Sequence, residues 1–303
     1  MGITPIIMHQ ISSTSSNPFA AFSMKLIPVL LFATSAVDAA DSGTITVPFW
    51  KSPQKKQGVH KSIKNAQTRF QLNILTPSEH ARSIGLQDFS DEPYTTNVTF
   101  GNGQVFSVDL DTGSSDVWIR GPQCTSQDGS CGTGMPAIDL ADSSIKRTGQ
   151  TWQTGYGSGS VAGDIYMGRV ALDTVETTLN FGVSTSETGF NSPGAGLWGL
   201  AYASINQIGG GNFVESAKVS SISFYFSDAV DGDMGELTIN GMDQTKFSGS
   251  MQYVPLSAQT FYQFDPSGGS FEVDGKSIKV TDTSAIADTG TTLLLAPQQV
   301  ADA

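Results

Sequence analysis

Short β-like runs of apolar residues recur along the chain from about residue 83 onward. Clear examples are Tyr94 to Phe100, Val105 to Leu110, Val117 to Ile119 and Leu237 to Ile239. Gly, Asn and Asp separate these runs, which is the pattern of strands joined by turns. The pattern therefore predicts an all-β fold built from many short strands.

Composition favours the same fold class. A chain of 303 residues allows about two domains, and 38% hydrophobic residues can supply a substantial core. Glycine is abundant at 33 residues and only 15% of residues are charged, which suits strands and turns better than helical bundles.

The N-terminal region contains the three parts of a secretory signal peptide. A positively charged start at 24–25 precedes an apolar run over 26–37, and small residues follow it. This run is too short to span a bilayer. We predict a signal peptide over 24–40 and secretion or delivery to a vacuole.

Residues 1–23 contain no Lys or Arg and are interpreted as an over-extended gene model. For the predicted signal peptide, a buried N-terminal strand or helix is the alternative.

Charge divides the chain into two unequal parts. Residues 42–82 hold seven bases and one acid, a net charge of plus 6, whereas residues 83–303 hold eight bases and 25 acids, a net charge of minus 17. The division predicts a basic prosegment over 41–85 that docks on an acidic body, and a solvated basic tail is the alternative. The overall charge of −12 disfavours nucleic acid and anionic membranes as partners.

Metal chemistry has little support in this sequence. Two cysteines and three histidines form no cluster with zinc spacing. We therefore expect no metal and no cofactor.

The triplet Asp-Thr-Gly occurs twice, at 111–113 and at 288–290, and the two aspartates lie 177 residues apart. Each copy follows a strand-like approach and continues with a hydroxyl residue, Ser114 or Thr291, and a further apolar run. One copy would mean little, but two copies separated by about the length of a domain predict a paired structure.

Two such turns facing each other would bring two carboxylates together. Like charges at contact distance cannot both ionise, so Asp111 and Asp288 would share one proton. One carboxylate can then take a proton from water while its protonated partner polarises a carbonyl group. In this arrangement, the hydroxyls of Ser114 and Thr291 orient the outer carboxylate oxygens.

Together these motifs resemble the pepsin-type aspartic peptidase family, of the kind secreted by fungi. Residues 156–160 resemble the tip of the flap, the hairpin that closes over a bound peptide in that family, and Trp118 resembles the tryptophan whose indole N–H supports the flap tyrosine, Tyr156. Residues 196–202 resemble the strand that crosses beneath the first active-site loop. The resemblance implies that the substrate main chain binds at Gly113, Gly157, Ser158, Gly290 and Thr291.

The same resemblance implies a bilobal, monomeric endopeptidase that acts on polypeptides and has its own prosegment as a partner. Its N-terminal lobe would span 86–248. The sequence ends at Ala303, 15 residues after Asp288, so we expect only part of a C-terminal lobe, over 249–303. Cys124 and Cys131 match the family's small disulfide loop, and free thiols are the alternative.

Other interpretations stay open at this point. Asp109 and Asp111 could form a phosphatase nucleophile motif, although Gly113 stands where that motif needs Thr or Val. Tyr156 could be an ordinary surface residue and Trp118 ordinary core. A pepsin-like protein that binds a peptide or partner without cleaving it is the main functional alternative. Asn97 begins a glycosylation sequon, on a predicted strand.

Overall fold

The structure is a computed structural model. It describes residues 5–7, 29–33, 45–48, 50–51, 94–131, 134–157, 159–190, 194–226, 235–248, 253–265, 270–273, 276–280, 284–291, 295–297 and 300. Most of these residues lie in β-strands, which confirms the predicted all-β class.

One sheet carries the first Asp-Thr-Gly turn. Within the described residues it contains eight strands, in the order β4-β5-β6-β11-β7-β10-β9-β8. Because β5 also pairs with β9, the strands between them in this order close into a ring. The strands are β4 (Trp50–Lys51), β5 (Tyr94–Phe100), β6 (Gln104–Asp111), β7 (Val117–Thr125), β8 (Lys146–Gly155), β9 (Ser160–Leu172), β10 (Val175–Thr188) and β11 (Gly196–Gly199).

A second sheet carries the approach to the second turn. Its order is β18-β15-β14-β1-β2-β12-β13-β3, so it joins late strands to strands from the N-terminal region. Its members are β1 (Pro5–Ile7), β2 (Val29–Ala33), β3 (Ile45–Pro48), β12 (Ser221–Tyr225), β13 (Glu236–Ile239), β14 (Val254–Gln259), β15 (Tyr262–Phe264) and β18 (Ala285–Ile286). A separate pair consists of β16 (Ser270–Val273) and β17 (Lys276–Lys279).

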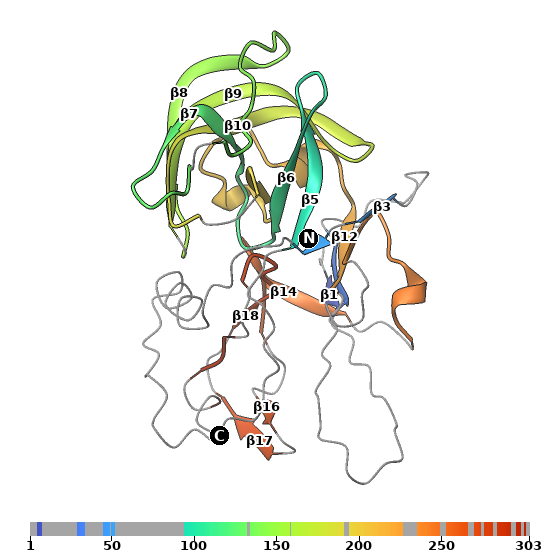
Figure 1. The fold of residues 1–303 in the computed structure, drawn as a ribbon. Coiled ribbons are helices and arrows are strands. Elements are labelled where there is room, and N and C mark those ends of the chain that lie inside the picture. The colour runs from blue at the N-terminus through green and yellow to red at the C-terminus, as the bar shows by residue number, and fades with distance from the viewer. Residues whose placement is uncertain are drawn as a thin grey trace.

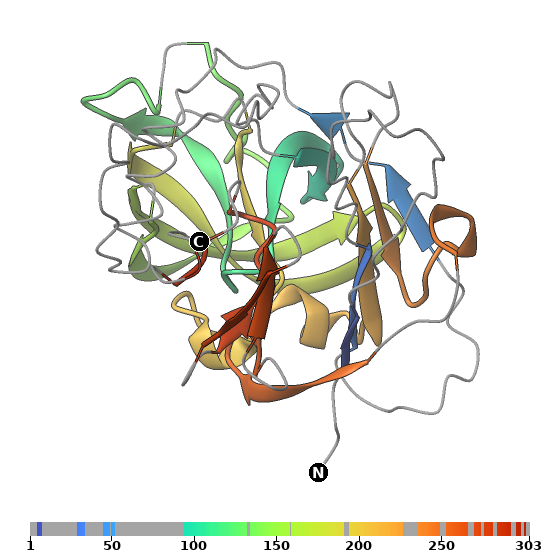
Figure 2. The same cartoon turned by 90° about the horizontal axis from the view of Figure 1, so that it is seen from below.

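Three short helical elements have described bounds: η1 (Ala203–Ile205), α2 (Phe213–Ser216) and η3 (Gln244–Lys246). Figure 1 shows β5 to β10 gathered in one lobe, with β14, β18, β16 and β17 below it. Seen from below, the orange and red strands lie in front of the green strands of the first sheet (Figure 2).

Aromatic side chains fill the core of the first lobe. Phe100 on β5 contacts Phe181 on β10 and Trp198 on β11 in edge-to-face geometry, and Trp198 packs in the same way on Phe213. All four side chains are buried. Full burial of a large apolar side chain contributes about 1.5–3 kcal/mol, so this cluster fixes how β11 lies between β6 and β7.

The proposed processing of the N-terminal region stays a prediction. Strand β2 lies within the predicted signal peptide, and β3 and β4 lie within the predicted prosegment. The rest of 41–85, and most of 1–40, lies outside the described residues. Across the described part of the chain, no helix has the length and apolar character that crossing a membrane requires. The predicted lobe boundary at 248 also stays a prediction.

Candidate active site

The first Asp-Thr-Gly turn begins where β6 ends. Asp111 is the last residue of β6 and is 1% exposed. Strand β11 runs parallel to β6 beneath this turn, and the backbone N–H of Leu200 donates to the carbonyl oxygen of Asp111 at 2.8 Å. Ala201 N–H donates to the carbonyl oxygen of Ser114, also at 2.8 Å. The crossing strand thus holds both ends of the turn.

Each oxygen of the Asp111 carboxylate accepts a hydrogen bond from its own turn. Gly113 N–H donates to Oδ1 at 2.8 Å, and the Ser114 hydroxyl donates to Oδ2 at 2.6 Å. These two bonds fix the plane of the carboxylate. Hydrogen bonds to an ionised carboxylate are among the stronger ones in proteins.

The second turn repeats this arrangement. Gly290 N–H donates to Oδ1 of Asp288 at 2.9 Å, and the Thr291 hydroxyl donates to Oδ2 at 2.6 Å. Asp288 follows β18, which pairs with β15, and Asp288 and Thr291 are both half-buried. The two aspartates are therefore held in the same way by different strands.

Reciprocal hydrogen bonds join the two turns through their central threonines. Thr112 N–H donates to Oγ1 of Thr289 at 3.0 Å, and Thr289 N–H donates to Oγ1 of Thr112 at 2.9 Å. The Thr112 hydroxyl donates to the carbonyl of Ala287 and the Thr289 hydroxyl to that of Leu110, each at 2.8 Å. Four bonds thus fix the turns face to face, although the two threonines lie 177 residues apart.

Gly290 lies directly against the first carboxylate. A Cβ atom built on Gly290 would stand 2.3 Å from Oδ1 of Asp111, closer than non-bonded atoms can approach. Only glycine fits this position without moving the carboxylate. The face-to-face arrangement expected for the repeated triplets is therefore present in the structure, and the backbone of the second turn touches Asp111.

The predicted flap is the hairpin between β8 and β9. Tyr156 N–H donates to the carbonyl of Gly159 at 2.6 Å, and Gly159 N–H returns a bond to the carbonyl of Tyr156 at 3.1 Å. The indole N–H of Trp118 donates to the Tyr156 hydroxyl at 3.0 Å. Gly157 is buried, and Ser158 lies outside the described residues.

A small apolar cluster lies beneath this hairpin. Phe190 packs edge to face on both Trp118 and Tyr156, with ring centroids 5.1 and 5.4 Å apart. Trp118 is also part of the cluster's buried core, being 1% exposed, so its roles as core and as hydrogen-bond donor coexist. The packing orients the Tyr156 ring.

Asp116 is a buried carboxyl group close to this cluster. It is 3% exposed, and its Oδ1 accepts from the backbone N–H groups of Gln207 at 2.8 Å and Ile208 at 3.1 Å. Burial raises the pKa of Asp116 above its ordinary value, although these two hydrogen bonds partly oppose the shift. A carboxyl group of this kind takes up a proton more readily than an exposed one.

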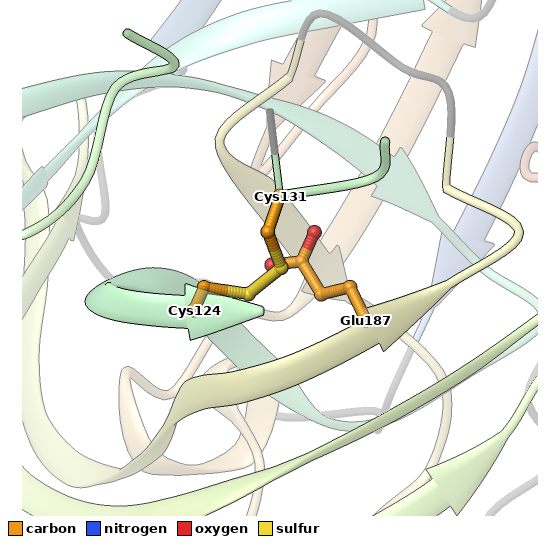
Figure 3. Close-up of side chains that lie close together, drawn as sticks. All are labelled: Cys124, Cys131 and Glu187. Carbon is orange, nitrogen blue, oxygen red and sulfur yellow. A yellow bond between two sulfur atoms is a disulfide. The ribbon is translucent and has the colours of Figure 1, made fainter. Parts of the chain in front are cut away.

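Cys124 and Cys131 form a disulfide, which confirms the predicted pair and excludes free thiols. Figure 3 shows the carboxylate of Glu187 beside this disulfide. Glu187 is fully buried and accepts from Arg120 Nη2 at 2.9 Å and from the Ser184 hydroxyl at 2.6 Å. The three potential ligand atoms lie within 4.8 Å of one another, but disulfide sulfurs are not the thiolates that metals bind.

Several residues of this site were missing from the sequence-based expectations. Thr112 and Thr289 stood inside the repeated triplets, so the repeat itself was their signal. Phe190, Asp116 and the Arg120–Glu187 pair had no comparable pattern, because their partners lie far away in sequence. Asn97, the predicted glycosylation site, is exposed on β5.

Comparison with known proteins agrees with this geometry. The family described as "Eukaryotic aspartyl protease" matches residues 93–303. Rhizopuspepsin from Rhizopus chinensis is 32% identical over 298 residues, covering 88% of this chain and 72% of that protein. Cathepsin D from Dictyostelium discoideum is 31% identical over 291 residues, covering 90% of this chain and 72% of that protein. The all-β fold, the paired turns and these similarities agree, and the chain belongs to the eukaryotic aspartyl protease family of pepsin-like peptidases.

Proposed function

We propose that this chain is an endopeptidase that hydrolyses extended polypeptides at acid pH through Asp111 and Asp288. The observation that carries the proposal is the set of reciprocal hydrogen bonds between Thr112 and Thr289, which brings the two Asp-Thr-Gly turns together. Family membership supports peptidase chemistry in general.

In the proposed mechanism, the two carboxyl groups share one proton. The ionised group takes a proton from a water molecule as the water oxygen attacks the scissile carbonyl carbon. The protonated group donates to the carbonyl oxygen, so charge does not accumulate there. As the tetrahedral intermediate collapses and the C–N bond breaks, the proton taken from water passes to the leaving amine, and the new hydroxyl returns its proton to the other carboxylate.

The hydrogen bonds at the two aspartates support this mechanism because they give the two oxygens of a carboxylate different surroundings. The hydroxyls of Ser114 and Thr291 each bind Oδ2 of the neighbouring aspartate. Oδ1 of Asp111 faces Gly290 of the opposite turn. The oxygen that faces the partner turn is the one placed to share a proton, and the hydroxyl keeps the other oxygen oriented.

The flap supports an extended substrate. Tyr156 is held by Trp118 and by the bonds across its own hairpin, so a peptide beneath it would meet a preformed edge. We expect main-chain bonding to Gly113, Gly157, Ser158, Gly290 and Thr291, in the manner of strand addition. Closure of such a hairpin shields the reaction from bulk water.

Processing and localisation form the second part of the proposal. The basic segment over 41–85 would inhibit the acidic body near neutral pH and dissociate in acid. We also propose that the protein is secreted or delivered to a vacuole, is monomeric and is glycosylated at Asn97. The exposed position of Asn97 is compatible with modification.

Substitution of either aspartate tests the mechanism. We expect Asp111→Asn and Asp288→Asn each to abolish cleavage of denatured protein near pH 4, because the proton relay needs both carboxyl groups. Asp142→Asn, a change away from the site, serves as the control. A loss below roughly tenfold in either aspartate variant would overturn the dyad assignment. A wild-type chain that binds peptide but does not cleave it would favour the non-catalytic alternative.

A further inference from the structure

The disulfide loop, residues 124–131, is shaped by hydrogen bonds as well as by its disulfide. The side chain of Asp128 accepts from Ser130 N–H at 3.0 Å and from the Ser130 hydroxyl at 2.7 Å, both at Oδ1. The Cys131 N–H donates to the Ser126 hydroxyl at 2.9 Å. The disulfide and these local bonds define the shape of the loop.

From this loop, two hydrogen bonds reach the segment that follows β10. Gly189 N–H donates to Oδ2 of Asp128 at 2.6 Å, and Phe190 N–H donates to the Ser130 hydroxyl at 3.1 Å. The two donors are consecutive backbone groups, about 60 residues beyond their acceptors. Ser130 is 1% exposed, so its bond to Phe190 is shielded from water.

Hydrogen bonding also sets the charge state of Asp128. Desolvation alone would raise its pKa, but the bonds from Ser130 and Gly189 together lower the pKa below its ordinary value. Asp128 therefore keeps its negative charge to lower pH than an ordinary aspartate.

The segment held by the loop contacts the flap in two places. The Phe190 ring packs on the Tyr156 ring. On the backbone side, a Cβ atom built on Gly159 would stand 1.7 Å from the carbonyl oxygen of Thr188 and 2.8 Å from Cα of Gly189. Such close approach is possible only for glycine, so movement of residues 188–190 would be transmitted directly to the hairpin.

We infer that Asp128 and Ser130 are positioning residues that hold the flap over the substrate by fixing Gly189 and Phe190 against Tyr156 and Gly159. The inference rests on the proposed peptidase function, because it assigns these residues a role in substrate binding. Neither residue needs to touch the substrate. The disulfide supports them by fixing the loop that carries both.

Kinetics of loop variants test this role. We expect Asp128→Ala and Ser130→Ala each to raise KM by roughly tenfold with a smaller change in kcat, since a loosened flap weakens binding before it alters the dyad. Asp128→Asn keeps one carbonyl oxygen as acceptor and should fall between wild type and Asp128→Ala. In a Tyr156→Ala background the Asp128→Ala change should have a smaller effect than in wild type, because the contact through Phe190 is already lost and only the contact at Gly159 remains.

Asp142→Ala is a matched control. Asp142 accepts from Ser144 N–H at 2.9 Å and from the Ser144 hydroxyl at 2.6 Å, so it repeats the local geometry of Asp128. It also accepts from Asn102 N–H, in the turn between β5 and β6, and not from the flap segment. This variant should leave KM unchanged.

Hydrogen exchange provides a measurement that does not depend on activity. In Asp128→Ala and Ser130→Ala, a peptide covering 152–162 should exchange faster than in wild type, and Asp142→Ala should not change it. Unchanged exchange in both loop variants, or equal losses of kcat/KM with and without Tyr156, would overturn the inference. An inactive wild-type chain would instead contradict the proposed function, and the exchange result would still decide the inference.

Discussion

Replacing Thr289 by valine tests the link between the two active-site turns. Valine has nearly the shape of threonine but no hydroxyl group. Two hydrogen bonds are lost: the one from Thr112 N–H, at 3.0 Å, and the one to the carbonyl of Leu110, at 2.8 Å. The Thr112 N–H and the Leu110 carbonyl then lose the Thr289 hydroxyl as a partner. Both groups belong to buried residues, since Thr112 is 0% and Leu110 3% exposed.

The expected cost follows from these two groups. Leaving one buried donor or acceptor unsatisfied costs about 1–3 kcal/mol, so the loss of two such bonds should lower the free energy of unfolding by about 2–6 kcal/mol. Thr112→Val removes the mirror-image pair of bonds and should cost a similar amount. The double variant should cost less than the sum, because the four bonds belong to one network.

Urea unfolding followed by tryptophan fluorescence measures this change through the shift in midpoint. Thr177→Val is a suitable control, because the Thr177 hydroxyl makes a single longer bond, at 3.3 Å, to the carbonyl of Ser216. We expect that control to lose about 1 kcal/mol or less. If Thr289→Val were no more destabilising than Thr177→Val, the cross-bonding would not be what holds the turns together.

Three further predictions concern charge. The raised pKa of Asp116 stabilises the wild-type fold in acid, and this stabilisation is lost as the pH rises through that pKa. The Tm of Asp116→Asn minus the Tm of wild type should therefore be more favourable to the variant at pH 7 than at pH 3. The same Tm difference at pH 7 and at pH 3 would contradict this. Glu187→Gln should destabilise the fold by about 3–5 kcal/mol by leaving the buried Arg120 without a countercharge, whereas the exposed control Glu176→Gln should cost under about 1 kcal/mol; equal shifts in urea midpoint would refute it. A synthetic 42–82 peptide should inhibit the enzyme near pH 6, less so in high salt, and not near pH 3, since carboxylates lose charge there; activity unaffected at every pH would make the segment a plain linker.

Local sequence patterns predicted where strands lie in the chain better than which strands pair with one another. The run Tyr94–Phe100 is the whole of β5, and Val105–Leu110 lies within β6. Strand β7 extends well beyond the predicted Val117–Ile119, because pairing with β10 continues past the apolar residues. Apolar periodicity measures burial along one strand, whereas the position of β11 between β6 and β7 depends on contacts between distant segments.

Parts of the site with a repeated or contiguous motif were also visible in the sequence. The two triplets, Tyr156 with its glycines and the cysteine pair are of this kind. Arg120 and Glu187 were not, because the charge of each side chain shows neither that it is buried nor which residue neutralises it. The role inferred for Asp128 likewise depends on Gly189, which no local pattern connects to it.

The reciprocal bonds between the two turns have the form of an isologous contact, in which one patch meets a copy of itself around a two-fold axis. Thr112 does for the second turn what Thr289 does for the first. In symmetric dimers this arrangement requires that each residue be compatible with its own counterpart. The same requirement applies here within one chain: a change in one triplet alters the surroundings of the other. The two Asp-Thr-Gly triplets are thus two copies of one self-complementary surface within a single polypeptide.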